Sequence, residues 1–435
     1  MIPKPSNCRF EVAVIGLGYV GLPLALGFAK AGCRTLGFDH DVERVRKLND
    51  GHSPLLHVPA EQIASATEGR VLEFTDDEDR LSESEAIIIC VPTPLGNHLD
   101  PDLASILVAG EKIACRLRPG MLVSLESTTY PGTTREDLRR VLEGISGLRA
   151  GVDFALAFSP EREDPGNAKS ILSEMPKVVG GFTGDCLERA AELYSRVVKR
   201  VVKVDSCDIA EAVKLTENIF RFINIALVNE LKRIYTPMGI DVWAVIDAAK
   251  TKPFGFMPFY PGAGVGGHCI PIDPYYLTWK AHEFGLETRL IELAGQINRS
   301  MPSYVVSRLT EALNAKSLTV RGCRILVLGV AFKKNISDER KSPSFAIINF
   351  LKEQGAEVDY YDPFVPRITA HCEHVHLVGR QSIAWSPENL SRYGAAVVCT
   401  AHDGVDYAAL ADAVPLIVDA CHVVPQNPKT TVVAA

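Results

Sequence analysis

The stretch Phe10-Glu-Val-Ala-Val-Ile-Gly-Leu-Gly-Tyr-Val-Gly21 decides the fold of the N-terminal part of this chain. Its apolar first half runs directly into the pattern Gly-x-Gly-x-x-Gly, which begins at Gly16, and an amphipathic stretch follows. A second short apolar run then ends at Asp39, 23 residues after Gly16. A strand, a glycine turn, a helix, a second strand and an acidic residue in this order predict a dinucleotide-binding Rossmann unit.

Each position of the glycine turn is suited to one part of a bound dinucleotide. Gly16 permits the tight turn, Gly18 lets the backbone approach the pyrophosphate, and Gly21 lets the helix pack closely against the strand. The start of the helix, at Tyr19 and Val20, supplies free N–H groups and a partial positive charge for the phosphates. We therefore predict that these five residues bind the cofactor.

The acidic residue at the end of the second strand predicts which dinucleotide binds. A carboxylate at Asp39 can accept hydrogen bonds from both ribose hydroxyls, and it repels a 2′-phosphate. This favours NAD over NADP. Arg44 follows shortly afterwards and would suit a 2′-phosphate, so the sequence leaves NADP open, and both residues are predicted to lie at the cofactor.

Three further buried-strand patterns occur at 86–91, 121–126 and 154–158. Each ends in polar and turn-forming residues, and ligands of an open parallel sheet bind outside the carboxyl ends of its strands. We expect these ends to line the site, although such residues also simply mark loops. The cofactor contacts predicted there are Pro92, Thr93, Ser127 and Thr128.

The middle of the chain has a different character. From about Ile209 no Gly or Pro interrupts until Pro237, and apolar residues recur every three to four positions. This pattern predicts one long helix to about Met238, of the kind that joins two domains or forms a dimer seam. Further amphipathic segments run to about Leu313.

A second α/β unit follows the helical region. The stretch 323–332 repeats the strand-to-glycine pattern of the N-terminus, 355–362 parallels 32–39, and 395–400 parallels 86–91. This copy lacks Gly-x-Gly-x-x-Gly and carries Lys333 and Lys334 where small residues would stand. Lysines suit a diphosphate as point charges, so this copy is predicted to bind a different phosphate-bearing ligand or none.

The predicted fold class is therefore α/β, with two doubly wound Rossmann-like domains joined by a long central helix and a helical middle region. We expect an NAD-binding domain over 1–205, a central helical and dimerisation region with a cysteine loop over 206–313, and a second Rossmann-like domain over 314–435. At 435 residues the chain is too long for one ordinary core, as this division requires.

A glycine-rich loop, 261–273, leads to a single cysteine. Four glycines stand within six consecutive positions, 262–267, and indicate unusual backbone angles or close approach by a ligand. Cys269 then stands four residues before Asp273, as a nucleophile near a candidate base. A buried free cysteine beside a turn would leave the same pattern.

A redox cofactor in the same chain gives the cysteine a possible chemical role. Oxidation of an alcohol to an aldehyde needs no thiol, but an aldehyde cannot release a second hydride until a nucleophile adds to its carbonyl. A thiolate gives a thiohemiacetal, loss of hydride leaves a thioester, and water cleaves it. The pattern thus predicts a four-electron oxidation that consumes two NAD.

Composition excludes several classes of protein. The chain is 47% hydrophobic and 23% charged, as expected of a soluble globular protein, with a net charge of −7 and no Lys/Arg-rich run. We expect no nucleic-acid partner. Neither a signal peptide nor an 18-residue apolar run is present, so no membrane span is expected.

Eleven cysteines are scattered without CxxC spacing, which predicts reduced thiols and a cytoplasmic location. The cluster His371-Cys372-Glu373-His374-Val375-His376 would place Cys372, His374 and His376 on one face of a strand. No second group of ligands is evident, so we predict no metal site.

Together the motifs resemble the UDP-glucose/GDP-mannose dehydrogenase family over nearly the whole chain. The matching motifs are Gly16–Pro23, Val91–Pro94, Glu126–Thr128, Ser159–Arg162, Lys214–Asn218, Gly266–Cys269 with Asp273, and Ala331–Lys334 with Arg340. Within the family, Gly-Gly-His-Cys-Ile-Pro-Ile-Asp-Pro274 resembles the branch that acts on UDP-N-acetylhexosamines. The run 251–262 is similar to that of bacterial UDP-N-acetylglucosamine 6-dehydrogenases, which make uronic acids for surface polysaccharides.

The resemblance implies roles for individual residues. Cys269 would be the nucleophile. Lys214 and Asn218, four residues apart on one helix face, would stabilise the oxyanion at C6 of the sugar. Asp273 and Glu161 are rival candidates for the base. Thr128 could hold the reacting water.

The remaining expectations concern the two ligands. Besides Glu161, Lys214 and Asn218, the substrate contacts expected are Arg162, Arg221, Phe259, Tyr260, Gly266 and Lys333. Arg340 matches a family position that reaches the cofactor or the active site. A solvated loop explains Arg162 almost as well, and core packing explains Phe259 and Tyr260 almost as well.

Two other functions remain compatible with the sequence. One is a two-electron dehydrogenase of the 3-hydroxyacid type, which also pairs a Rossmann domain with a helical domain but does not need Cys269. The other is a non-catalytic sensor of NAD or sugar nucleotides on the same fold. The sequence does not choose between the epimers of the N-acetylhexosamine, and the long helix favours a homodimer or higher homo-oligomer.

Overall fold

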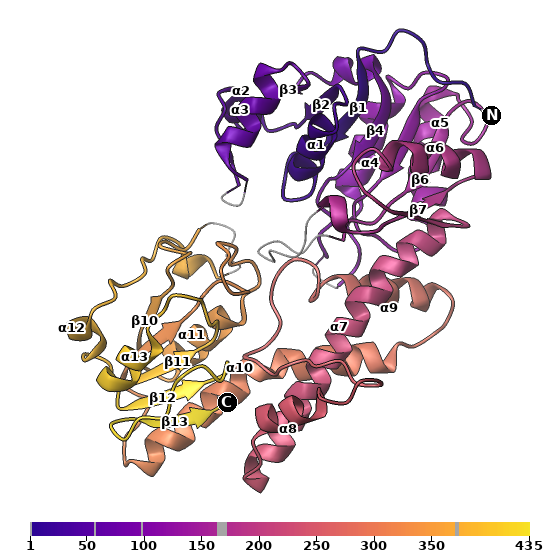
Figure 1. The fold of residues 1–435 in the computed structure, drawn as a ribbon. Helices are drawn as coiled ribbons and strands as arrows, with labels where there is room; N and C mark the ends of the chain where they lie inside the picture. Colours follow the sequence, from indigo (N-terminus) through magenta and orange to yellow (C-terminus); the bar gives the residue numbers. More distant parts are fainter. Residues whose placement is uncertain (1, 56–57, 97–98, 163–171, 370–373) are drawn as a thin grey trace. The chain divides into compact units, whose positions relative to one another are not determined.

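The computed structural model describes residues 2–55, 58–96, 99–162, 172–369 and 374–435. The chain divides into two compact units. The first comprises Met1–Glu217 and Tyr275–Glu287, and the second comprises Asn218–Pro274 and Thr288–Ala435. Each unit is built around one twisted sheet of mainly parallel strands (Figure 1).

The described residues of the first unit form a sheet of eight strands in the order β3-β2-β1-β4-β5-β6-β7-β8. Only the β6–β7 pair among them is antiparallel. The strands are β1 (Phe10–Ile15), β2 (Thr35–Phe38), β3 (Leu72–Thr75), β4 (Ser84–Ile89), β5 (Leu122–Leu125), β6 (Ala155–Phe158), β7 (Lys177–Gly181) and β8 (Val201–Val204). The chain reverses its direction of travel across the sheet between β1 and β4, which is where an open α/β sheet binds its ligand.

Helices cover both faces of this sheet. One face packs on α1 (Gly21–Lys30), α2 (Val42–Asn49), α3 (Ala60–Glu68) and α6 (Gly184–Tyr194). The other packs on α4 (Ala104–Ala114), α5 (Arg139–Ser146) and the start of α7 (Cys207–Tyr235). Single turns complete the unit, namely η1 (Glu78–Glu83), the π-helical η2 (Thr133–Leu138) and η3 (Leu172–Glu174). Since both faces are covered, strands such as β6 read as continuous apolar runs.

The long helix α7 forms as its uninterrupted apolar spacing predicts. It covers Cys207–Tyr235 and ends in the 3₁₀ turn η4 (Thr236–Met238), which contains Pro237. The helical region continues with α8 (Val242–Ala249), α9 (Asp273–Glu283) and α10 (Arg289–Ala315).

The helix α10 continues past a proline, Pro302, which lies inside it. Proline cannot donate a hydrogen bond to the carbonyl of Asn298. The glycine-rich loop packs at this place: a Cβ on Gly264 would lie 3.4 Å from the Asn298 carbonyl oxygen and 3.5 Å from Cδ of Pro302. Tertiary packing thus carries the helix past the proline.

The second sheet has the strand order β10-β9-β11-β12-β13, and the pairs between its described strands are parallel. The strands are β9 (Arg324–Leu328), β10 (Glu357–Tyr361), β11 (Ala395–Val398), β12 (Leu416–Asp419) and β13 (Thr431–Ala434). One face packs on α10 and α11 (Pro343–Glu353), and the other on α12 (Pro387–Leu390) and α13 (Tyr407–Ala413). The short turn η5 covers Val375–Leu377. The predicted pair of Rossmann-like domains is therefore confirmed.

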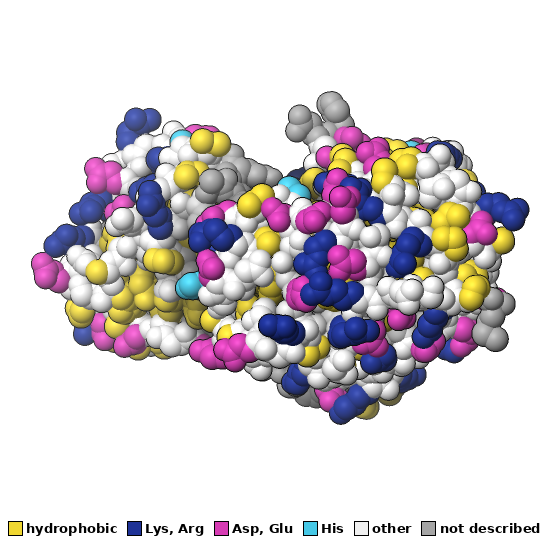
Figure 2. Space-filling view, turned by 90° about the horizontal axis from the view of Figure 1, so that it is seen from above, with side chains coloured by type: hydrophobic (Ala, Val, Ile, Leu, Met, Phe, Trp, Pro, Cys, Tyr) yellow, Lys and Arg dark blue, Asp and Glu magenta, His cyan; other side chains and the backbone are white. Residues whose placement is uncertain are grey.

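Charged side chains of both signs are mixed on the surface. Figure 2 shows basic and acidic side chains interspersed over the face that it presents. Ion pairs join many of them, as where Arg116 lies 3.0 Å from Glu78 and 2.7 Å from Asp79. Within the described residues, no helix is both long and apolar enough to cross a bilayer.

Candidate active site

The glycine turn after β1 has the geometry that its sequence predicts. Gly16 adopts φ +90°, and a Cβ there would lie 2.6 Å from the carbonyl oxygen of Cys90, at the end of β4. A Cβ on Gly21 would lie 1.8 Å from the Gly16 carbonyl oxygen. Only glycine allows the strand ends and the first turn of α1 to approach so closely.

The space above this turn fits a phosphate group. A Cβ on Gly18 would meet no described atom within 4 Å. Val20, which precedes α1, has an apolar side chain that cannot cap the helix. No described side chain caps this helix start, and the positive end of the helix dipole favours an anion there. Tyr19, beside them, is 37% exposed.

Asp39 is held by the same turn. Its carboxylate is buried and accepts hydrogen bonds from the Leu17 amide at 2.8 Å and the Asp41 amide at 3.0 Å. The Arg44 guanidinium lies 2.9 Å from Oδ2 of Asp39. A carboxylate accepts about four hydrogen bonds, so Asp39 retains capacity for a ribose hydroxyl. Because its guanidinium is engaged by Asp39, Arg44 has less capacity for a 2′-phosphate, and the arrangement fits NAD.

Replacement of Asp39 by alanine is expected to raise the Kd for NAD about 10- to 100-fold, since a hydrogen bond to a charged group contributes about 1.5–3 kcal/mol. The Kd for UDP is expected to stay constant. Isothermal titration of both ligands measures this, with Asp41→Ala, which removes the side-chain cap of the adjacent helix α2, as the matched control. Equal losses for the two ligands would show that Asp39 is structural.

The ends of β4 and β5 lie beside the glycine turn. The Ser127 hydroxyl donates to the Val91 carbonyl at 2.7 Å, which ties the two strand ends together. Thr93 is buried, and its carbonyl accepts from the Tyr276 hydroxyl at 2.7 Å. Pro92 is exposed and Thr128 is half-buried. The predicted cofactor residues of this region thus share one edge of the first sheet.

A lysine in the first half of α7 contacts a glutamate of the loop after β6. Lys214 is only 7% exposed, and its Nζ donates to the backbone carbonyl of Glu161 and lies 3.7 Å from Oε2 of the same residue. Arg162 pairs with Glu217 at 2.5 Å and donates to the Pro176 carbonyl at 2.7 Å. The loop after β6 is therefore attached to α7 at two points. The residues that follow, 163–171, lie outside the described residues.

Sequence reasoning missed Glu211, which is fully buried on α7. Its carboxylate accepts from the Gly132 amide at 2.7 Å and from the Thr134 amide and hydroxyl at 2.9 and 2.7 Å. Glu211 stands three residues before Lys214, so these bonds fix the lysine-bearing turn of α7 to the loop after β5. An acidic residue on an apolar helix face was the available signal.

The ionisation of Glu211 makes the stability of the first unit depend on pH. Burial raises the pKa of Glu211 from 4.5 to about 8. The folded state binds this proton more tightly than the unfolded state, so the stabilisation is complete below pH 4.5 and is lost as the pH rises to about 8. We expect the unfolding midpoint of Glu211→Gln, compared with the native chain, to lose this pH dependence. Thermal denaturation across pH 5–8 tests it, with Glu217→Gln as control, and parallel curves would contradict it.

The cysteine loop lies in the second unit and packs against the loop after β9. A Cβ on Gly266 would lie 2.8 Å from the Lys341 carbonyl oxygen, and one on Gly267 would lie 2.7 Å from the Phe332 ring. Gly267 has φ +90°, and its amide donates to the Arg340 carbonyl at 3.0 Å. The glycines therefore serve both unusual backbone angles and close approach of another chain segment.

Cys269 is exposed at the end of this loop. Its carbonyl accepts from the Asp273 amide at 2.8 Å, so the cysteine stands one turn before α9. Asp273 is 2% exposed, and its Oδ2 accepts from Nδ2 of Asn218 at 2.5 Å. Asn218, Cys269 and Asp273 thus form one constellation, as the sequence predicts.

The residue before the cysteine stays uncharged. Burial, together with the charges of Arg340 and Lys341, lowers the pKa of His268 to about 4. The neutral imidazole offers one donor and one acceptor at neutral pH. Arg340 itself pairs with Asp338 at 2.5 Å, and Lys333, on the same loop, is half-buried.

The other predicted substrate residues lie on or near α7 and α8. Phe259 packs against the apolar cluster of α8 and stands 5.8 Å from the Phe220 ring. The Tyr260 hydroxyl donates to Asp247 at 2.7 Å. Arg221 is exposed on α7. Core packing accounts for the contacts of Phe259.

The described histidines of the cluster at 371–376 make hydrogen bonds rather than a metal site. Residues 371–373, including Cys372, lie outside the described residues. His374 and His376 are hydrogen-bonded to the side chain of Asn349 at 2.7 and 2.9 Å. Among the residues that the structure describes, no group of three His, Cys, Asp or Glu side chains could hold a metal ion.

Comparison with known proteins identifies the family. Three domain profiles of the UDP-glucose/GDP-mannose dehydrogenase family match the chain: the NAD binding domain over 10–198, the central domain over 208–300 and the UDP binding domain over 326–426. The chain is 43% identical over 357 residues to UDP-N-acetyl-D-glucosamine 6-dehydrogenase of Pseudomonas aeruginosa, covering 82% of this chain and 83% of that protein. It is 37% identical over 393 residues to the enzyme of the same name from Salmonella typhi, covering 90% of each.

Solved structures agree with this relationship. The structure of UDP-D-ManNAc dehydrogenase from Pyrococcus horikoshii superposes with a TM-score of 0.87 at 33% sequence identity. The match covers 97% of this chain and 98% of that one. With a glycine turn, an Asp39 carboxylate and a cysteine loop arranged as described, the chain belongs to the UDP-glucose/GDP-mannose dehydrogenase family and its N-terminal domain binds NAD.

Proposed function

We propose that this protein oxidises the C6 hydroxyl of UDP-N-acetylglucosamine to the carboxylate, with two NAD, for the synthesis of surface polysaccharide. The observation that carries the proposal is the constellation of exposed Cys269 with the buried pair Asp273–Asn218, in a chain with an NAD-binding domain. The 43% identity to a UDP-N-acetyl-D-glucosamine 6-dehydrogenase supports the choice of sugar.

The first step converts the alcohol to an aldehyde. NAD held in the N-terminal domain would supply the hydride acceptor for both oxidations. A carboxylate, from Glu161 or Asp273, takes the hydroxyl proton. The Lys214 ammonium and the Asn218 amide stabilise negative charge on the C6 oxygen as the C–H bond breaks. The side-chain amide of Asn218 donates one hydrogen to Asp273, and its second hydrogen can be donated to the C6 oxygen.

The second step makes the acid. The Cys269 sulfur adds to the aldehyde carbon and gives a thiohemiacetal, whose C–H hydride leaves to form a thioester. Water, held by Thr128 and deprotonated by Glu161 or Asp273, attacks the thioester carbon and releases Cys269 as thiol. Over the whole reaction the alcohol, two NAD and one water give the carboxylate, two NADH and three protons, so four electrons leave the sugar.

The C-terminal domain holds the nucleotide in this proposal. Lys333 contacts the diphosphate or the sugar, Arg340 reaches the cofactor or the active site, and Gly266 borders the sugar. Neutral His268 presents a donor and an acceptor that suit an acetamido group. Arg162 and Arg221 are further candidates for contact with the sugar nucleotide.

The proposed organisation follows the division into 1–205, 206–313 and 314–435, with a homodimer in the cytoplasm. An apolar row on α7 supports association. Its members Phe220, Leu227 and Ile234 are seven residues apart and 46%, 48% and 44% exposed. A heptad spacing of exposed apolar side chains is typical of a helix–helix seam.

Turnover with four nucleotide sugars tests the proposal. UDP-N-acetylglucosamine, its galacto and manno epimers and UDP-glucose are each incubated with NAD, and NADH and product mass are followed. Fastest kcat/KM with UDP-N-acetylglucosamine, with formation of the acid, is expected. The similar Pyrococcus horikoshii protein acts, by its name, on the manno epimer. A preference for that epimer would change the proposed substrate and leave the proposed four-electron oxidation in place. No acid from any of the four would contradict the proposal.

A further inference from the structure

The second sheet repeats the binding turn of the first. Gly329 follows β9 with φ +80°, and a Cβ there would lie 2.3 Å from the Thr400 carbonyl oxygen. Its amide donates to the Tyr361 carbonyl at 2.9 Å, as the Gly16 amide donates to Phe38 at 2.9 Å. The ends of β9 and β11 thus form the same close approach as β1 and β4.

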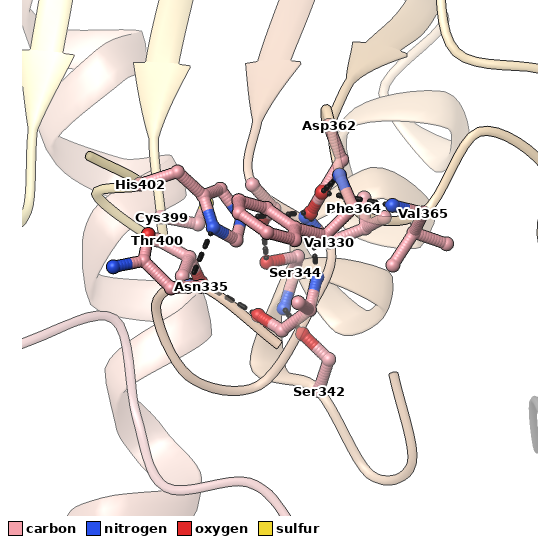
Figure 3. A network of polar contacts seen from close by, with 12 residues as sticks. Val330, Asn335, Ser342, Ser344, Asp362, Phe364, Val365, Cys399, Thr400 and His402 are labelled. Carbon is pink, nitrogen blue, oxygen red and sulfur yellow. Dashed lines mark hydrogen bonds and ion pairs between the residues drawn. The ribbon is translucent and has the colours of Figure 1, made fainter. Parts of the chain in front are cut away.

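The carboxylate that follows the second strand also has its counterpart. Asp362 accepts from the Val330 amide at 2.8 Å, as Asp39 accepts from Leu17. It accepts in addition from the Ala331 amide, from two amides of its own loop, and from a histidine ring (Figure 3). A carboxylate has about four lone-pair sites, so these five donors leave no capacity for a ribose hydroxyl.

The histidine on Asp362 is His402, which is 2% exposed. Its Nε2 lies 3.0 Å from Oδ2 of Asp362, and its Nδ1 lies 2.9 Å from the backbone nitrogen of Asn335. A backbone N–H can only donate, so Nδ1 accepts and the ring proton resides on Nε2. Both ring nitrogens are therefore engaged, and one tautomer is fixed.

Asn335 closes the turn that carries Lys333. It adopts φ +61°, and its side chain exchanges two hydrogen bonds with Asp403, at 2.6 and 2.9 Å. The loop after β9 is thereby attached to the loop after β11 at the residue beside His402. Figure 3 shows His402 between Asn335 and Asp362.

We propose that His402 is a positioning residue for the nucleotide: by binding the Asn335 amide and the Asp362 carboxylate together, it fixes the turn that presents Lys333 to the diphosphate. Four amides and the imidazole together fill the Asp362 carboxylate, the counterpart of Asp39, so in this proposal the second copy takes its ligand at the Lys333 turn instead of at this carboxylate. This inference rests on the proposed function, in which the C-terminal domain binds UDP.

Titration of the full-length protein with UDP tests the inference. His402→Ala is expected to raise the Kd for UDP about tenfold, since an unpaired buried amide and a freed turn remain. His402→Asn places its Oδ1 near the position of Nδ1 and restores the bond to Asn335, so it should bind UDP within about threefold of the native chain. His402→Gln restores only the bond to Asp362 and should fall between the two.

A second variant avoids the buried position. Glycine at position 335 tolerates positive φ and keeps the backbone N–H that donates to His402, but Asn335→Gly removes both side-chain bonds to Asp403. Asn335→Gly should therefore raise the Kd for UDP, as His402→Ala does. In turnover all of these variants should raise KM for the sugar nucleotide with kcat nearly constant, and the Kd for NAD should not change.

The outcomes separate this inference from the proposed function. Native UDP affinity in folded His402→Ala, or weaker binding in His402→Asn than in His402→Gln, would overturn the positioning role alone. Unchanged UDP affinity in Asn335→Gly would overturn it as well. A native chain that does not bind UDP would overturn both.

Discussion

Cys269→Ser should reduce acid formation by about 10⁴-fold or more, since removal of a covalent nucleophile costs a factor of that order. Serine keeps the size of the side chain, but its hydroxyl is not ionised near neutral pH and adds far less readily to an aldehyde. The loop should keep its fold, because its contacts are made by the backbone and by glycines. We therefore expect native Kd values for UDP and NAD, measured by titration, beside the loss of acid measured by mass.

The matched control is Cys115→Ser. Cys115 is also exposed, but it lies at the end of α4, far along the chain from the cysteine loop. Native turnover in this variant would show that the effect of Cys269→Ser does not come from general thiol loss. Acid formation at the native rate by Cys269→Ser would remove the cysteine from the mechanism.

Lys214→Met should lower kcat by about 10²- to 10³-fold, which is the usual effect of deleting one oxyanion-stabilising group. Methionine fills the space of the buried lysine stem without its charge. Because the ammonium acts on charge that develops during hydride loss, KM for the sugar nucleotide should change little. Steady-state kinetics measures the split between kcat and KM.

Lys203→Met provides the comparison. This lysine precedes α7, is half-exposed and pairs with Glu188 at 2.5 Å. An exposed pair contributes little, so this variant should turn over normally. A rise in KM with constant kcat in Lys214→Met would show that the lysine only binds substrate.

Local patterns allowed much of the fold to be predicted. The glycine turn, Asp39, the second copy at 323–362 and the long helix α7 all depend on residues close in sequence or on periodicity, and the structure has them where expected. Proline usually ends a helix, but Pro302 lies inside α10. The predicted roles of the site residues stay predictions.

The contacts that hold the site were not predictable from the sequence. Glu211 bonds to Gly132 and Thr134, 79 and 77 residues away, and His402 bonds to Asn335, 67 residues away. Lys177 and Glu126 likewise form a buried pair at 2.7 Å across 51 residues. The sequence does not indicate which distant residue each of these side chains bonds to, and only the fold brings the partners together.

The most direct test of the account is the amount of NADH formed per sugar nucleotide consumed at completion. A ratio of two, with the uronic acid as product, is the result that the account predicts, because the thiol retains the aldehyde until its second hydride has left. A ratio of one, with an aldehyde or ketone as product, would contradict it and would place the protein among two-electron dehydrogenases.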